Sequence, residues 1–306
     1  MPTTQKSLPF TTLDVFTTTP YSGNPLAIVS LPSPCPLTQA QKQLIAKEFN
    51  LSETVFLHPS PDSSATVPEW EIDIFTTDEE LPFAGHPTVG TASYVLGLAG
   101  KKKGVLRTKA GRIPVEVVQG VGVRAEVPFD THLHGKTLSG EQRGLSKDAS
   151  IRKAELEAPL FSIVKGMTFQ LIQLPSLELL GKVEMTGLSP DFNVVLDEEW
   201  KPSFVSRYYY VLLDDGKGDG EVRIRSRMVE AKMEDPATGS AACALSAYLA
   251  GEWRKGMKFE IVQGVEMGRR SEIGVEVDVD VKADGGIGGV RLSGCAVAVM
   301  EGSLKV

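Results

Sequence analysis

The sequence carries one short pattern twice, as HPTVGTA at residues 86–92 and as DPATGSA at residues 235–241. Both copies read polar residue, proline, two variable residues, glycine, hydroxyl residue and alanine, so the match pairs Gly90 with Gly239. A strand-like segment precedes each copy and a run of small residues follows it. Self-similarity of this kind is typical of a duplicated structural unit. We therefore expect two halves of one architecture, each presenting a turn and the start of a helix.

The chemistry of the repeated turn suggests an anion site. Proline suits the first position of a helix, and the polar residue before it, His86 or Asp235, is well placed to cap that helix. Glycine lets a ligand approach the backbone, and the free N–H groups of a helix start attract anions. The pattern predicts small-residue helices over 88–98 and 237–249, which could hold a carboxylate without lysine or arginine. Simple helix capping is the alternative.

The remainder of the chain reads as mixed α and β structure with many short strands. Thr38 could cap a helix whose apolar face carries Leu37, Leu44, Ile45 and Phe49. A further helix is expected near residues 190–200, and Gly-rich turns such as 284–286 separate strands in the last part of the chain.

The composition excludes several classes of protein. The chain has 306 residues, 42% hydrophobic and 23% charged, which is average for a globular protein of about two domains. The net charge of −7 argues against nucleic acid or an anionic membrane as a partner. No membrane helix and no signal at residues 1–10 are visible, so we expect a cytoplasmic protein. Three widely spaced cysteines form no zinc or redox motif, and no nucleotide fingerprint occurs in a credible context.

Three residues are candidates for acid and base chemistry. Glu53 stands at the mouth of the apolar segment 51–56, where partial desolvation could raise its pKa and let it move a proton. His86 and Asp235 are the titratable groups of the repeated turns. An exposed or capping role is the alternative for each. His132 and His134 form an HxH pair, but no nearby cluster of cysteines or carboxylates in the sequence completes a metal site. Cys243 is expected to be a packed, inert thiol.

Several short motifs together resemble the PhzF-like family of phenazine biosynthesis, which shares its fold with diaminopimelate epimerase. They are LDVF at 13–16, GNPLA at 23–27, LSETVF at 51–56, PFAGHPT at 82–88, GTA at 90–92, EDPATGSA at 234–241, QG at 263–264 and MGR at 267–269. These motifs occur in order and span nearly the whole chain, so their combination is highly specific.

The resemblance implies an α+β fold of two pseudo-symmetric lobes, each a curled, mostly antiparallel sheet or barrel around a central helix. Residues 1–128 would form the first lobe, completed by the final strand at about 296–306, and residues 129–295 the second. In the related epimerases one cysteine from each half moves the proton. Aligning the turns places Ala84 and Pro236 at those positions, so a two-thiol mechanism is excluded.

The resemblance also implies the site and the reaction. Glu53, His86 and Asp235 would be catalytic, and Asn24, Ser52, Gly85, Gly239 and Ser240 would bind the substrate. The implied activity is that of an isomerase or epimerase without cofactor or metal, which moves a proton on a small unsaturated or α-acidic carboxylic acid in a cleft between the lobes.

Some features depart from the family's pattern, and other functions remain open. Ala242 stands where many members have histidine, and Met228 where they have an aromatic residue, so the phenazine precursor is not assumed as the substrate. A non-catalytic protein that binds carboxylates or partners is the main alternative. Lyase or hydratase chemistry in the same cleft is a third. By resemblance we expect a homodimer.

Overall fold

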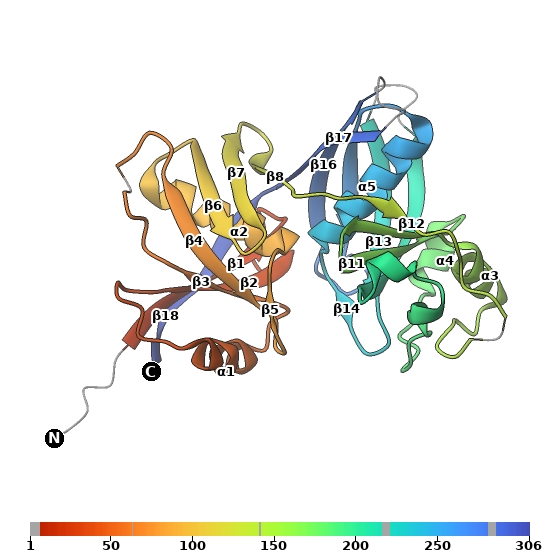
Figure 1. The fold of residues 1–306 in the computed structure, drawn as a ribbon, viewed down its shortest axis with the longest axis horizontal. Coiled ribbons are helices and arrows are strands. Elements are labelled where there is room, and N and C mark those ends of the chain that lie inside the picture. Colours follow the sequence, from red (N-terminus) through yellow and green to blue (C-terminus); the bar gives the residue numbers. More distant parts are fainter. Residues whose placement is uncertain (1–6, 63, 141, 216–220, 281–285) are drawn as a thin grey trace. The chain divides into compact units, whose positions relative to one another are not determined.

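The computed structural model describes residues 7–62, 64–140, 142–215, 221–280 and 286–306 (Figure 1). Residues 1–6, part of the segment examined for a signal, and most of the Gly-rich turn at 284–286 lie outside these ranges. The chain divides into two compact units, one comprising Met1–Glu126 with Ser293–Val306 and the other Val127–Leu292. We call them the first and the second unit.

The first unit is a curled sheet closed around one helix. Its strands are β1 (Ser7–Val15), β2 (Asn24–Ser30), β3 (Thr54–Leu57), β4 (Glu69–Phe75), β5 (Glu80–Leu81), β6 (Lys103–Thr108), β7 (Gly111–Val118), β8 (Gly122–Glu126) and β18 (Ala296–Lys305). Its helices are α1 (Gln39–Phe49) and α2 (Gly85–Ala99). Helix α2 contacts β1, β2, β3, β6, β7 and β8. It is buried on most sides because its small, apolar residues let the strands approach it.

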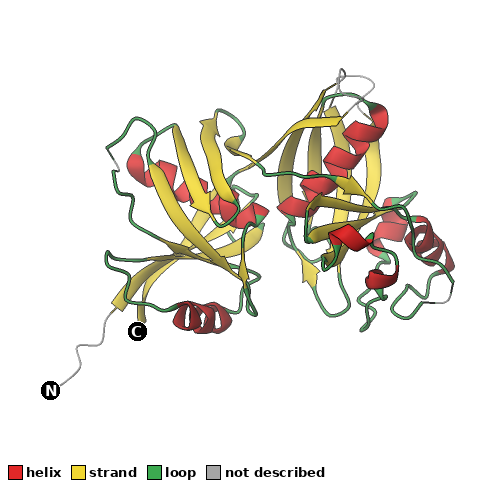
Figure 2. Ribbon diagram, viewed as in Figure 1, coloured by secondary structure: helices red, strands yellow, loops and turns green. Residues whose placement is uncertain are grey.

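The second unit repeats this plan. Its strands are β9 (His132–Leu133), β10 (Leu160–Val164), β11 (Met167–Gln173), β12 (Phe204–Asp215), β13 (Glu221–Val229), β14 (Glu234–Asp235), β15 (Met257–Gln263), β16 (Ser271–Asp280) and β17 (Gly286–Gly294). Its helices are α3 (Ala149–Glu157), α4 (Leu177–Gly181) and α5 (Gly239–Trp253), with single 3-10 turns η1 (Phe192–Val194) and η2 (Glu198–Trp200). Helix α5 packs on β10, β11, β15 and β16 (Figure 2).

The strand pairings show that the two units are copies of one design. In the first, β1–β2 is antiparallel, β2–β3 parallel, β3–β4 antiparallel, β4–β6 parallel and β6–β7 antiparallel. In the second, β10–β11, β11–β12, β12–β13, β13–β15 and β15–β16 follow the same alternation. Strand β18 pairs antiparallel with β1 as β9 does with β10. The predicted α+β class is therefore confirmed.

The structure corrects how the two copies of the repeated turn correspond. Helices α2 and α5 are each 15 residues long and begin at Gly85 and Gly239, each after a two-residue strand. Gly239 therefore corresponds to Gly85, whereas the sequence match paired it with Gly90. By the same equivalence Thr238, and not Pro236, is the counterpart of Ala84.

The expected caps of these helices were also wrong. Ala84 and Thr238 occupy the N-cap positions, and neither makes a side-chain capping hydrogen bond. His86 lies inside α2, and Asp235 ends β14 before α5 starts. Both polar side chains are thus available for contacts other than capping the helix.

Two other predicted helices had different outcomes. Thr38 caps α1 in a reciprocal capping box with Gln41, as expected. The prediction of a helix near residues 190–200 is wrong, because only the single 3-10 turns η1 and η2 form there. The Asp191 carboxylate accepts a hydrogen bond from the backbone N–H of Asn193. A side chain that pairs with a nearby backbone group in this way favours a short turn over a longer helix.

A buried ion pair anchors α3 in the second unit. The Arg207 guanidinium lies 3.4 Å from the carboxylate of Glu155, and both side chains are almost completely buried. The Tyr209 hydroxyl donates to the same Glu155 oxygen over 2.6 Å, and Arg207 also donates to the carbonyl of Gly144. Because every charged group has a partner, the segment leading into α3 is fixed against β12.

Candidate active site

Four side chains predicted for the site come together in the first unit. Asn24 opens β2, Ser52 and Glu53 immediately precede β3, and His86 is the second residue of α2. Strands β2 and β3 are parallel neighbours, with Ala27 opposite Thr54, so their starts lie at the same edge. The start of the central helix reaches that edge as well. We call Asn24, Ser52, Glu53 and His86 the first-unit group.

The carboxyl of Glu53 is the central member of this group. Its Oε2 lies 3.6 Å from Nδ1 of His86, and its side chain is 17% exposed. Burial raises the pKa of Glu53 from 4.5 to about 7, and a hydrogen bond from Ser52 opposes part of that rise. A carboxyl with this pKa is present in both protonation states near neutral pH, as proton transfer in both directions requires.

Asn24 orients the imidazole of His86. Its amide nitrogen lies 3.4 Å from His86 Nδ1, and because an amide nitrogen only donates, it favours an accepting Nδ1. The Ser52 hydroxyl oxygen also lies 3.5 Å from the side-chain oxygen of Asn24. Asn24 and His86 are both buried, so these contacts fix the two side chains beside the carboxyl.

A glycine before Asn24 is required by the same turn. Gly23 has a φ of +68°, and a Cβ atom there would lie 2.3 Å from the carbonyl oxygen of Val15. Only glycine fits both the conformation and the space. The GNP motif therefore serves to bring Asn24 into the group.

The other predicted residues lie in the second unit, around the start of α5. Asp235 is buried, and its carboxylate accepts a hydrogen bond of 2.5 Å from the Thr238 hydroxyl. Gly239 and Ser240 are the first two residues of α5, as Gly85 and His86 are of α2. We call Asp235, Thr238, Gly239 and Ser240 the second-unit group.

Gln263 holds the second-unit group and was given no role from the sequence. Its amide nitrogen donates to the carbonyl of Asp235 over 2.8 Å and to the Thr238 hydroxyl over 3.1 Å. Its amide oxygen accepts from the backbone N–H of Thr238 at 3.2 Å and from the Tyr208 hydroxyl at 3.1 Å. All four hydrogen bonds are buried. The QG motif at 263–264 was the signal available in the sequence.

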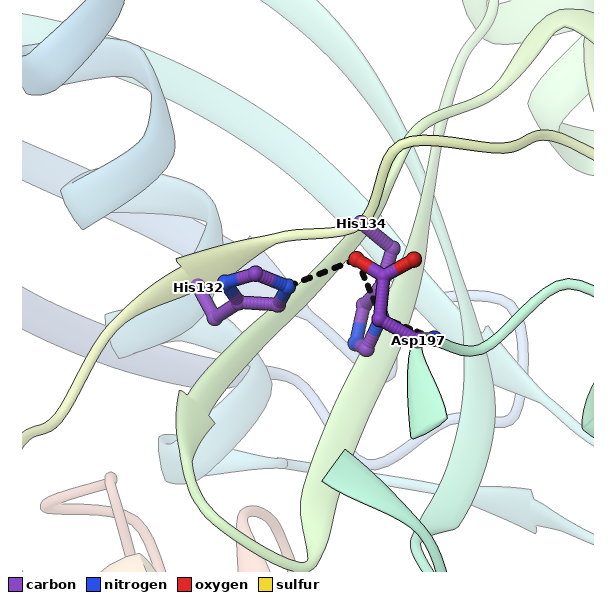
Figure 3. A group of neighbouring side chains, drawn as sticks. All are labelled: His132, His134 and Asp197. Atoms are coloured by element: carbon purple, nitrogen blue, oxygen red, sulfur yellow. Dashed lines mark hydrogen bonds and ion pairs between the residues drawn. The ribbon is translucent and has the colours of Figure 1, made fainter. Parts of the chain in front are cut away.

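The HxH pair meets a carboxylate that the sequence did not place nearby. Asp197 Oδ2 lies 2.8 Å from His132 Nε2 and 3.7 Å from His134 Nδ1 (Figure 3). However, His134 Nδ1 accepts the backbone N–H of Asp197, and its Nε2 contacts the Ser162 hydroxyl at 3.0 Å. Both of its nitrogens are thus engaged by protein groups, and burial lowers its pKa. The cluster ties η2 to β9, and ring stacking of Trp200 on His132 supports this structural role.

Cys243 shows no sign of reactivity. It is buried in the middle of α5, and burial raises the pKa of its thiol far above the usual range. A thiol that stays protonated is a poor nucleophile and a poor base. This agrees with the expected inert thiol.

The duplicated fold and the first-unit group can now be compared with known proteins, which place this chain among the isomerases. The chain belongs to the PhzC/PhzF family, described as phenazine biosynthesis-like protein, whose model matches residues 13–302. It is 33% identical to the trans-2,3-dihydro-3-hydroxyanthranilate isomerase of Pseudomonas fluorescens over 85% of this chain and 86% of that protein. It is 32% identical to an uncharacterized isomerase of Mesorhizobium japonicum over 96% of this chain and 97% of that protein.

A solved structure shows the same fold. The PhzF-family protein of Bacillus anthracis superposes with a TM-score of 0.73 at 24% identity, covering 98% of this chain and all of that one. The expected family, fold and isomerase class are thus confirmed. The homodimer stays a prediction. In the described part of the chain, no helix is long and apolar enough to cross a membrane.

Proposed function

We propose that the protein moves a proton between two carbon atoms of a small unsaturated or α-acidic carboxylic acid, with Glu53 as the proton carrier. The observation that carries the proposal is the Glu53 carboxyl itself, partly buried beside His86 with its pKa raised to about 7. The named activity of the Pseudomonas fluorescens relative supports it, because that enzyme isomerises an unsaturated ring acid.

The proposed reaction needs only one carboxyl group. Ionised Glu53 takes a proton from a carbon beside a double bond, and the electron pair left behind moves into the conjugated system. Protonated Glu53 then returns a proton to another carbon, so no atom or electron is gained or lost. Because the side chain is 17% exposed, that proton can exchange with solvent before it is returned. His86, held by Asn24, would support the charge that develops on the substrate during this transfer.

The substrate's own carboxylate would be bound by backbone N–H groups. Helix starts such as those at Gly85 in α2 and at Gly239 and Ser240 in α5 attract anions. We propose that Asp235 contributes to substrate binding or proton transfer from the second-unit group. The identity of the acid is left to experiment, and the dihydro-hydroxyanthranilate of the named relative is the first compound to test.

Deuterium uptake from solvent tests the role of Glu53 directly. The wild-type protein and Glu53→Gln are incubated in D₂O with the dihydro-hydroxyanthranilate, and deuterium in the substrate and product is measured by NMR. We expect the variant to lose exchange and turnover by about a thousandfold. The exposed Glu79→Gln is the control and should match wild type. Equal exchange by Glu53→Gln and wild type would remove Glu53 from the mechanism.

Binding measurements separate this enzyme from a binding protein that keeps the fold. If wild type binds the acid and neither exchanges deuterium nor forms product, the non-catalytic alternative holds. Oxygen from labelled water appearing in the product would point instead to hydratase chemistry.

A further inference from the structure

The second unit contains a cavity at the end of α5 that is remote from Gly239. Its volume is about 350 Å³, and Glu157, Gln173, Tyr210, Tyr248, Glu252 and Trp253 line it. Because α5 has 15 residues, the two ends of the helix are about 20 Å apart. None of the residues proposed above for the reaction lines this cavity.

The electrostatic character of the cavity is negative from several sources. Helix α3 ends at Glu157 and α5 ends at Trp253, so two helix C-termini meet there. The last turn of each helix carries no basic residue. A helix C-terminus bears partial negative charge, and such an end attracts cations. The carboxylates of Glu157 and Glu252 add two full charges.

The cations near the cavity do not cancel this charge. Lys153 lies 3.9 Å from Glu157, but both side chains are largely exposed, so the pair is weak. Arg254 and Lys255 follow α5 and are exposed. Neither lines the cavity, and its lining, all of it within the described residues, contains no lysine or arginine. A cation bound there would compete for Glu157 with Lys153, whose exposed pair is weak.

Aromatic rings supply the second part of the site. Tyr210 is buried and donates a hydrogen bond of 3.4 Å to the side-chain oxygen of Gln173. The ring of Tyr248 is held edge-on against Phe161, with 5.7 Å between the centroids. Trp253, also part of the lining, is 38% exposed. The faces of tyrosine and tryptophan rings attract organic cations, which lose less hydration energy than a small metal ion does.

We propose that this cavity binds a small organic cation of the alkylammonium class, with its charge between Glu157 and Glu252 and its alkyl groups against Tyr248 and Trp253. The volume falls within the range of small-molecule sites. Carboxylates combined with aromatic walls distinguish such a cation both from an anion and from a neutral apolar molecule. The site is separate from the proposed reaction, so either proposal can fail without the other.

Tryptophan fluorescence provides a direct test, because Trp253 lies in the cavity and only two other tryptophans occur in the chain. Choline is titrated into the wild-type protein at constant ionic strength. Dimethylbutanol, in which a carbon atom replaces the choline nitrogen, is the uncharged control ligand. We expect saturable binding of choline with a Kd on the order of 1 mM. Dimethylbutanol should bind about tenfold more weakly. The Trp253→Phe variant should lose the signal.

Charge-neutral variants assign the binding to this cavity. Glu252→Gln and Glu157→Gln should each weaken choline binding by about fivefold, measured by NMR line broadening of the choline methyl signal. Glu184→Gln, an exposed residue of the same unit that does not line the cavity, is the matched control and should bind as wild type does. Absence of saturation, equal affinity for both ligands, or unchanged affinity in both variants would overturn the proposal.

Discussion

Glu53 Oε2 and His86 Nδ1 lie 3.6 Å apart, although one residue precedes a strand and the other lies in the first turn of the central helix. The contact depends on the closure of the first-unit sheet around α2. It places the imidazole ring of His86 beside the carboxyl that carries the proposed proton transfer.

The raised pKa of Glu53 predicts how the stability of the folded protein depends on pH. A folded-state pKa of about 7, against 4.5 for the free group, means that the folded protein holds this proton more tightly than the unfolded chain does. The contribution to stability is therefore full below pH 4.5 and is lost as the pH rises to about 7. The loss should amount to about 3 kcal/mol.

Urea unfolding at pH about 5 and about 8 measures this effect. Wild type should lose more free energy of unfolding between the two pH values than Glu53→Gln, whose side chain does not titrate. Glu79→Gln serves as the control because its carboxyl is exposed. Parallel curves for wild type and Glu53→Gln would show that Glu53 has no raised pKa.

The Ser52→Ala variant should move the pH profile of the reaction. If ionised Glu53 starts the reaction, kcat/KM rises with pH through its pKa of about 7. The Ser52 hydroxyl opposes part of the pKa rise, so its removal should shift the profile toward higher pH. The measurement is kcat/KM against pH for both proteins. A profile that keeps its midpoint in Ser52→Ala would contradict the assignment.

Gln263→Leu should disrupt the second-unit group. Leucine has a similar size but makes none of the four buried hydrogen bonds, so the polar groups of Asp235, Thr238 and Tyr208 lose partners. We expect the free energy of unfolding to fall by about 3 kcal/mol and KM for the acid to rise. Denaturant unfolding and steady-state kinetics measure the two effects. Gln119→Leu, at an exposed position, is the control; equal stability of both variants would refute the role of Gln263.

Two glycines of α2 should respond in opposite ways to alanine. A Cβ atom at Gly90 would lie 2.6 Å from Leu26 and 2.7 Å from Val15, whereas one at Gly97 would meet nothing within 4 Å. Gly90→Ala should therefore destabilise the protein by about 2 kcal/mol. Gly97→Ala should stabilise it by up to about 1 kcal/mol, since alanine favours helix more than glycine does. Thermal unfolding of the two variants checks both signs, and equal shifts would contradict the close packing of α2.

Local signals in the sequence were enough for much of the fold. The capping box at Thr38 and the small-residue composition of α2 and α5 are properties of short segments, and the sequence reveals such properties directly. The correspondence between the two copies of the repeat could not be obtained from a short segment. The sequence pattern paired Gly90 with Gly239 because the residue types agree, whereas in the structure Gly85 and Gly239 each begin the central helix of their unit. The correct pairing follows from the strands β5 and β14, which precede α2 and α5 at the same distance.

The candidate site shows the same limit. The sequence was enough to propose Glu53 and His86 as catalytic residues. The burial that raises the pKa of Glu53, however, comes from elements that are distant in the chain. Gln263 was missed as a positioning residue because its four hydrogen-bonding partners belong to β12, to the end of β14 and to the N-cap of α5. The carboxylate of Asp197 reaches His132 and His134 only through the folded chain. Sequence motifs thus identify candidate site residues more readily than the burial and the hydrogen-bond partners that those residues have in the folded chain.

The pairing of β18 with β1 has a consequence for biosynthesis. The residues that pair with β1 along one edge, from Lys305 opposite Ser7 to Ala296 opposite Val15, are translated after the whole second unit. In the second unit the equivalent strand, β9, is made before β10. The first unit must therefore wait until the second unit and β18 have been synthesised before its sheet is finished, while the second unit already holds its own edge strand.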